Sequence, residues 1–237
     1  PVKDLYTDFK RVKMSNEKGK DNIIVVAARK KIIHSYMEAL KKADLEVIAL
    51  DVEPAAVARA LIAAEETDKT AYLILDMGAE TTTITIYDFG SIQITGSTRI
   101  AGNTLTESFV KALKISVSDA EDVKRHIINA ERKIKKPLFD SAIKPVLTKL
   151  AKEIERSIGY YTNYMNSPHE IKKIIVTGGN AHFPGMTEFL ADYFRIKTEI
   201  GNPWTNVTAY PLKAMPKLKA SLYTTAIGLA LRELVEK

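Results

Sequence analysis

Residues 72–83 read YLILDMGAETTT, an apolar run that meets an acid at Asp76 and a glycine at Gly78 before a polar segment begins. An apolar run closed by such a turn is typical of a buried strand. Gly78 would let backbone amides approach an anion closely, and Asp76 can hold the magnesium ion that accompanies phosphate groups. The alternative is an ordinary hairpin turn in which Asp76 hydrogen-bonds only the backbone. Taken alone, the motif favours neither interpretation.

A second apolar run also ends in glycines, because residues 174–185 read IIVTGGNAHFPG. The pair Gly178 and Gly179 would let the main chain pass a flat ligand at contact distance, and Phe183 or His182 could lie against a purine ring. A Gly-Gly pair after a strand is most often just a turn. Two such turns, each leaving a buried strand and separated by helices, match a nucleotide held in a cleft between two related lobes.

The rest of the chain alternates strand-like and helix-like patterns, which predicts an α/β fold with mixed sheets. Capping-box patterns at Thr104 and Ser118 predict that two helices begin there. The other expected helices cover 30–43, 53–65, 142–165, 186–194 and 219–235, and the expected strands cover 5–12, 23–28, 46–50, 72–76, 83–88, 92–98, 171–177 and a short piece near 198.

The composition narrows the function classes. The 237 residues include no cysteine, which excludes a disulfide framework, a thiolate metal site and a cysteine nucleophile. The four histidines are scattered, so their spacing does not predict a zinc site. The longest apolar run, Ile23 to Ala28, falls far short of the roughly 18 residues that a membrane-spanning helix needs, so we expect no direct membrane span.

Positive charge is concentrated in one part of the chain. The net charge of the chain is +6. Residues 111–152 contain eleven Lys or Arg and five Asp or Glu, so this stretch alone has a net charge equal to that of the whole chain. Such a stripe can contact nucleic acid or acidic lipid. No nucleic-acid-binding motif accompanies it, so we expect a solvated helical face and no nucleic-acid partner.

Several of these segments resemble the actin-like ATPase superfamily. Leu75–Ile84 is similar to its second phosphate loop, and Val176–Gly185 is similar to its adenosine loop. Ala101-Gly102-Asn103 resembles the element that opens the second lobe, although Asn103 stands where a second glycine is usual. Further resemblances lie at 51–56 and 226–232, which look like the two connecting segments, and at 120–124, which looks like the helix start that touches the adenosine sugar and base.

Within that superfamily the chain most resembles the PilM family of type IV pilus assembly proteins, on residues 76–83, 118–126, 143–150 and 201–204. FtsA cell-division proteins are the nearest alternative, but we see no C-terminal amphipathic membrane anchor of the kind that FtsA carries. The resemblance implies actin-like (ribonuclease H-like) lobes, with mixed sheets flanked by helices, and part of a small inserted SHS2-like domain. The implied boundaries are 1–29 for the partial inserted domain, 30–98 for the rest of the first lobe, 99–218 for the second lobe and 219–237 for a connecting helix.

The resemblance also implies ATP and Mg²⁺ as ligands, with Asp76 as the metal-binding and catalytic carboxylate. Glu53 would be a second catalytic carboxylate near the metal, and a first-turn acid favoured by the helix dipole is an equal alternative. Glu121 either faces the ribose or completes a helix cap. The implied nucleotide-binding residues are Asp76, Gly78, Ala79, Glu80, Thr81, Thr82, Glu121, Lys124, Gly178, Gly179, Asn180 and Phe183. The family's first phosphate loop, an Asp-x-Gly turn, is not found before Asp76, so we expect weakened nucleotide binding by these residues alone.

The function implied first is a cytoplasmic, ATP-binding component of the type IV pilus assembly platform, peripheral at the inner membrane. It would bind the cytoplasmic tail of a PilN-type protein, and a pilus motor ATPase or a second copy of the chain are further implied partners. It would be at most a slow ATPase, because Glu53 is the one obvious general base near Asp76. The alternatives are a nucleotide-independent scaffold of the same fold, an FtsA-like cell-division protein, and a phosphotransferase of the superfamily.

Overall fold

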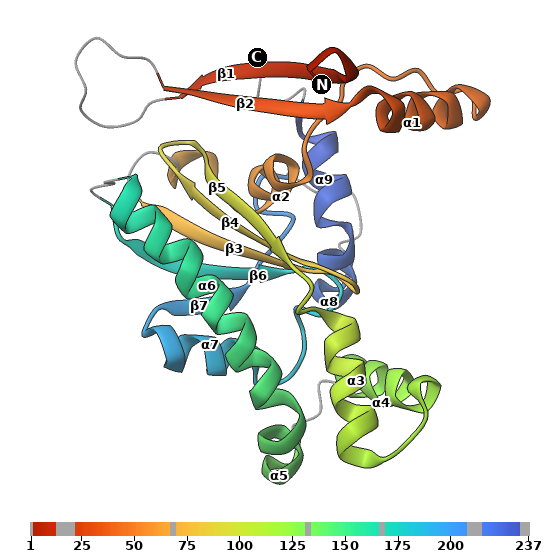
Figure 1. Ribbon diagram of the computed structural model, residues 1–237, viewed down its shortest axis with the longest axis vertical. Coiled ribbons are helices and arrows are strands. Elements are labelled where there is room, and N and C mark those ends of the chain that lie inside the picture. Colours follow the sequence, from red (N-terminus) through yellow and green to blue (C-terminus); the bar gives the residue numbers. More distant parts are fainter. Residues whose placement is uncertain are drawn as a thin grey trace. The chain divides into compact units, whose positions relative to one another are not determined.

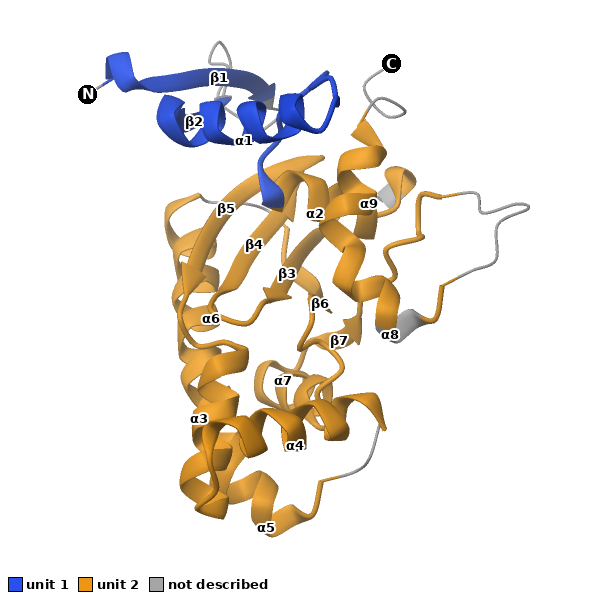
Figure 2. Cartoon of the chain, turned by 90° about the vertical axis from the view of Figure 1, so that its right-hand side faces the viewer, with its two compact units in different colours: residues 1–53 blue, residues 54–237 orange. Residues whose placement is uncertain are grey.

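The computed structural model describes residues 2–12, 22–66, 70–130, 134–165, 169–207 and 215–232. The chain forms two compact units, residues 1–53 and 54–237 (Figure 2). The sequence also predicts turns at 16–20 and 67–70. The first and most of the second lie outside the described residues.

Unit 1 contains a hairpin and a helix, both as predicted. Strands β1 (Leu5–Val12) and β2 (Asn22–Arg29) pair antiparallel, after η1 (Val2–Asp4) and before α1 (Lys30–Lys42). The strand expected over 46–50 is wrong, because these residues form no regular element. A strand needs a neighbour to pair with, and β1 and β2 pair with each other in a two-stranded sheet.

Unit 2 is built on one five-stranded mixed sheet in the order β5-β4-β3-β6-β7 (Figure 1). The first three strands pair antiparallel, whereas β6 lies parallel to both β3 and β7. This confirms the predicted α/β class. The strands are β3 (Ala71–Met77), β4 (Thr82–Asp88), β5 (Ser91–Thr98), β6 (Ile171–Thr177) and β7 (Lys197–Ile200).

The central strand β3 is buried on both faces, which explains its continuous apolar sequence. Successive side chains of a strand point to opposite faces. Leu73 and Leu75 therefore enter the larger core, which includes residues of α3, α6 and α7, whereas Tyr72 and Ile74 enter a second cluster formed with α2. Figure 1 shows α6 running across one face of the sheet.

The helices of unit 2 are α2 (Glu53–Leu61), η2 (Ala64–Glu66), α3 (Gly102–Leu113), α4 (Val117–Asn129), α5 (Lys136–Leu138), α6 (Lys144–Tyr164), α7 (Met186–Phe194), α8 (Lys217–Ala220), η4 (Ser221–Tyr223) and α9 (Thr224–Ala230). Helix α7 has the predicted bounds, whereas the other predicted helices of unit 2 have shifted ends. The helix expected over 219–235 is divided into α8, η4 and α9, and its predicted end lies outside the described residues. A π-helix, η3 (Phe139–Ile143), precedes α6. Pro145 has no amide hydrogen to donate back to residue 141, and a π-turn at this point accommodates that loss.

Both predicted helix starts are displaced. Helix α3 begins at Gly102, and Thr104 lies inside its first turn, where its hydroxyl oxygen accepts a hydrogen bond from the Ala101 amide. Helix α4 is capped by Ser116, whose Oγ accepts from the amide of Asp119, so the cap lies two residues before the predicted Ser118. Polar residues one turn apart fit several capping registers, and tertiary contacts decide among them.

The predicted boundaries of the lobes stay a prediction. Strands from either side of residue 98 share the five-stranded sheet, since β5 ends at Thr98 and β6 begins at Ile171. The boundary between the compact units lies between Glu53 and Pro54.

Candidate functional site

Two strands carry the glycine turns to the same edge of the sheet. Strands β3 and β6 are parallel neighbours, and Asp76 lies opposite Thr177 in their register. The turns at Gly78 and at Gly178–Gly179 therefore leave the carboxyl ends of adjacent strands, where α/β sheets commonly bind ligands. The two turns thus lie side by side at the edge of one sheet, which differs from the expected cleft between two lobes with one turn on each.

Close packing joins the two turns at Asp76. Gly178 has a φ of +90°, and a Cβ there would overlap Oδ1 of Asp76 and lie 2.7 Å from the carbonyl oxygen of Met77. A side chain would also be strained at this φ. Only glycine fits, so the half-buried carboxylate of Asp76 rests against the backbone of the second turn.

The first turn contains three consecutive exposed residues whose amides are not needed to close it. The amide of Gly78 donates to the carbonyl of Thr81 at 3.0 Å, which closes the turn. Ala79, Glu80 and Thr81 are exposed, and their amides make no hydrogen bond within the described residues. These amides, and not that of Gly78, are the donors that the turn offers to a phosphate. Thr82 is buried, and its hydroxyl donates to the carbonyl of Ile100 at 2.7 Å, so this hydroxyl links the turn to the segment before α3.

The start of α3 supports the first turn from the side. The amides of Gly102 and Asn103 donate to the carbonyls of Gly78 and Ala79 at 3.1 and 2.7 Å. The first amides of a helix have no partner within it, so these contacts satisfy them. They also hold the carbonyls of the turn toward α3.

Asn180 ties the second turn to both of these elements. Its side-chain Nδ2 donates to the carbonyl of Gly78 at 2.9 Å, and its backbone amide donates to that of Met77 at 3.2 Å. A Cβ at Gly102 would overlap this side chain. The predicted contact of Asn180 with the nucleotide stays a prediction; in the structure its hydrogen bonds join the second turn to the first.

Lys124 and Glu121 form a buried network at the start of α3. Lys124 is 4% exposed, and its Nζ donates to the carbonyl of Gly102 (3.1 Å), to Thr106 Oγ1 (2.9 Å) and to Glu121 Oε2 (2.7 Å). All three ammonium protons thus have protein acceptors. Burial raises the pKa of Glu121, but hydrogen bonds and charge from Lys124, with contacts from Thr106 and Arg125, outweigh it and leave that pKa below its ordinary value.

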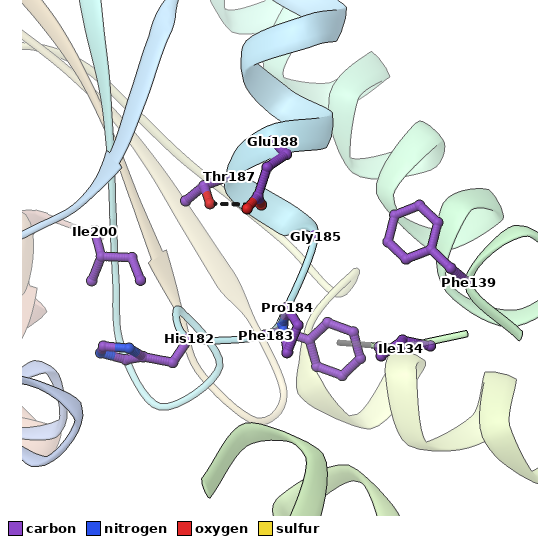
Figure 3. Close-up of a pocket in the computed structure, with 9 residues that line it drawn as sticks. All are labelled: Ile134, Phe139, His182, Phe183, Pro184, Gly185, Thr187, Glu188 and Ile200. Atoms are coloured by element: carbon purple, nitrogen blue, oxygen red, sulfur yellow. Dashed lines mark hydrogen bonds between the residues drawn. The ribbon is translucent and has the colours of Figure 1, made fainter. Parts of the chain in front are cut away.

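Phe183 belongs to the core. It is 2% exposed and its ring centroid lies 6.1 Å from that of Phe109, so stacking on a purine would require the core to open. The loop of residues 182–185 also lines a pocket of about 560 Å³ with Ile134, Phe139 and Ile200 (Figure 3). Gly179, by contrast, is exposed, and a Cβ there would lie 3.2 Å from Leu222 of η4.

Glu53 is the exposed first residue of α2 and stands at the boundary between the two units. Its proposed approach to the metal stays a prediction.

Two residues of the site were missed from the sequence. Thr106 links Lys124 and Glu121, and the hydroxyl of Thr177 meets that of Thr224 at 2.7 Å, which joins β6 to α9. Isolated threonines carry no sequence signal. For Thr177, the position next to Gly178 was the available indication.

The described residues fit a magnesium–phosphate ligand better than a free metal ion. No group of three or more acidic or histidine side chains that could hold a metal occurs among them. Magnesium bound with phosphates needs only one or two protein carboxylates. One half-buried carboxylate beside the amides of three exposed residues is the donor set for such a ligand.

The family model for "Type IV pilus assembly protein PilM" matches residues 1–234. The chain belongs to the PilM family. A solved "PilM-PilN type IV pilus biogenesis complex" contains a similar structure, with a TM-score of 0.77 and 27% identity, over 97% of this PilM-family chain and 67% of that chain.

Other solved structures show that the fold is actin-like. The ethanolamine utilization protein EutJ from Carboxydothermus hydrogenoformans matches with a TM-score of 0.61 and 21% identity, over 86% of this chain and 62% of its own. MreB5 of Spiroplasma citri, solved bound to ADP, matches with a TM-score of 0.56 and 19% identity, over 88% and 67%.

The curated relatives include cell-division proteins FtsA. The Bacillus subtilis protein is 20% identical over 195 residues, covering 76% of this chain and 44% of the relative. The Pseudomonas aeruginosa protein is 23% identical over 236 residues, covering 91% and 54%. This PilM-family chain thus spans about half the length of the curated relatives it matches. Among the described helices, none combines the length and apolar character needed to cross a bilayer.

Proposed function

We propose that this chain is the part of a type IV pilus assembly protein that binds ATP and Mg²⁺ at the edge formed by Asp76, the 78–81 turn and Gly178–Gly179. The observation that carries the proposal is the contact of the Asp76 carboxylate with Gly178, which brings a carboxylate and two glycine turns to one place. The actin-like fold, shared with an MreB solved bound to ADP, supports it.

The residues divide the task of holding the ligand. The amides of 79–81 would receive the phosphate oxygens, and Asp76 would hold the metal, which neutralises phosphate charge when bound. Glu121 and Lys124 would fix the start of α3 beside the turn, since their polar atoms already bond to one another. Nucleotide would act here as a ligand that biases conformation, with slow hydrolysis at most.

The test is calorimetric titration of the complete protein with ATP, with and without Mg²⁺. Asp76→Asn should weaken Mg²⁺-dependent affinity by roughly 10- to 100-fold, the loss typical when a group supporting a bound metal is removed. Asp192→Asn is the matched control, because it makes the same change from carboxylate to amide at an exposed position on α7. This variant should bind ATP and Mg²⁺ normally. Absence of any Mg²⁺-dependent affinity in the unaltered protein would refute the proposal.

The proposed partner is the cytoplasmic tail of a PilN-type protein, because a similar chain was solved in a PilM-PilN complex. Under this proposal the protein would lie on the cytoplasmic side of the inner membrane. If the two sites are linked, nucleotide should change the affinity for a synthetic tail peptide by some factor, and the peptide should change the affinity for nucleotide by the same factor. Equal affinities in the presence and absence of nucleotide would show that they are independent.

A nucleotide-independent scaffold is the second candidate. The observation that favours it is that the amide of Gly78 and all three donors of Lys124 are used within the protein. Under this alternative, the Asp76→Asn protein would retain full affinity for the tail peptide and would support pilus assembly.

A further inference from the structure

A groove lies between α3 and the segment formed by η3 and the start of α6. It encloses about 410 Å³, within the range of ligand-binding clefts. Buried Ala142 and Val146 contribute apolar surface, while Lys111 on α3 and Lys149 on α6 line it from two different helices.

The two lysines have no partner that neutralises them in the described part of the chain. Both are exposed, and neither forms an ion pair there. Glu107 is the one carboxylate among the residues that line the groove. The groove therefore offers apolar contact flanked by two lysines, with a net positive charge after Glu107 is counted.

The surroundings increase this positive charge. The stretch 111–152 accounts for the chain's whole net charge of +6, and its described part covers the end of α3, α4, α5, η3 and the first part of α6. Lys114, Lys144 and Lys152 are also exposed. In contrast, Lys124 from the same stretch is buried and already paired.

The shape of the site favours a protein segment as occupant. A bilayer surface is flat and cannot enter a hollow between two helices, and the lining residues include no aromatic ring on which a nucleic-acid base could stack. An amphipathic helix places apolar side chains on one stripe and can carry carboxylates on either side of it, which matches apolar surface between lysines.

We propose that this groove binds an acidic amphipathic segment of a partner protein, with apolar side chains against Ala142 and Val146 and carboxylates near Lys111 and Lys149. Complementary charge of this kind speeds association and selects the partner, while the apolar contacts retain it. The site is separate from the proposed nucleotide site, and it requires no nucleotide.

The test uses two synthetic helical peptides with the same leucine stripe, one flanked by glutamates and the other by lysines. Fluorescence anisotropy with the complete protein should show binding of the acidic peptide and none of the basic one. Lys111→Glu combined with Lys149→Glu should weaken acidic-peptide binding by about tenfold or more, as expected for reversed charges at an interface. Lys172→Glu, an exposed site on β6, should leave it unchanged.

A second variant removes space without altering charge. Ala112→Trp fills the groove from an exposed position on α3 and should also abolish peptide binding. Nucleotide titration of each variant, which should be normal, separates failure of this proposal from failure of the proposed function. The proposal is overturned if both peptides bind alike, if neither binds, or if the variants bind the acidic peptide normally. It is also overturned if the double variant loses affinity only for phosphatidylglycerol vesicles or duplex DNA.

Discussion

Single side chains hold the sheet of unit 2 together at the end opposite the glycine turns. Asp88 is fully buried, and its Oδ2 accepts a hydrogen bond of 2.6 Å from the Tyr161 hydroxyl. Its Oδ1 lies 2.7 Å from His169 Nδ1, and the His169 ring stacks on Phe89. A buried carboxylate is stable only when its hydrogen-bonding capacity is satisfied. These contacts therefore join the β4–β5 turn to α6 and to the segment that leads into β6.

Tyr161→Phe removes one of these donors without changing the shape of the core. We expect a loss of about 1.5–3 kcal/mol in the free energy of unfolding, the usual range for a hydrogen bond to a charged group. Urea denaturation followed by circular dichroism measures it. Tyr164→Phe, one turn later and 77% exposed, should change stability little, and equal effects of the two substitutions would contradict this explanation.

The carboxylate of Glu121 predicts that the stability of the protein depends on pH. Its pKa in the folded protein lies below the ordinary value of 4.5, so its contribution to stability is complete above that value and is lost as the pH falls through the lower, folded-state pKa. Glu121→Gln should therefore be less stable than the unaltered protein at neutral pH, and the difference should shrink below pH 4.5.

The measurement is urea unfolding between neutral and acidic pH, with the exposed Glu107→Gln on the neighbouring helix as the control. A difference between Glu121→Gln and the unaltered protein that does not vary with pH would show that the carboxylate charge is not responsible.

At the scale of elements, helix α9 meets α2 without room for a side chain. A Cβ at Gly228 would overlap the carbonyl group of Ala56, and Arg59 Nη1 donates to the Gly228 carbonyl at 2.9 Å. Backbone atoms cannot yield as a flexible side chain can. The approach of the two helices therefore depends on this glycine.

Gly228→Ala should consequently force α9 away from α2 and destabilise unit 2 by about 1–3 kcal/mol, the range seen for overpacked cores. Gly159→Ala on α6 is the matched control, because its nearest neighbour is a side-chain atom of Asn163 at 3.9 Å. That change should be neutral or stabilise the protein by up to about 1 kcal/mol through helix propensity. Thermal melts distinguish the two, and a stabilising Gly228→Ala would refute the close contact.

At the scale of the whole molecule, burial differs sharply between the two units. No described residue of unit 1 is buried, whereas β3 and β6 form the centre of two core clusters in unit 2. Elements with few buried contacts open locally at low free-energy cost. The two units should therefore differ in their protection from solvent.

Hydrogen exchange of the 237-residue chain should show fast exchange of α1 amides and slow exchange of β3 and β6 amides. Mass spectrometry of peptides covering 30–42, 71–77 and 171–177 measures the difference. Equal protection of all three segments would show that unit 1 has a stable core of its own.

The amino-acid sequence by itself determined the α/β class, β6 and α7 to the residue, and the two glycine turns. Continuous apolar runs and glycine pairs are local signals that need no partner to be recognised. The tertiary structure decided that β3 and β6 are neighbours, that Asn180 and Lys124 fasten loops instead of standing open, and that Phe183 enters the core. It also decided where α3 and α4 begin. Each of these depends on which distant groups satisfy a buried polar atom or fill a space, and that information resides in the packed molecule.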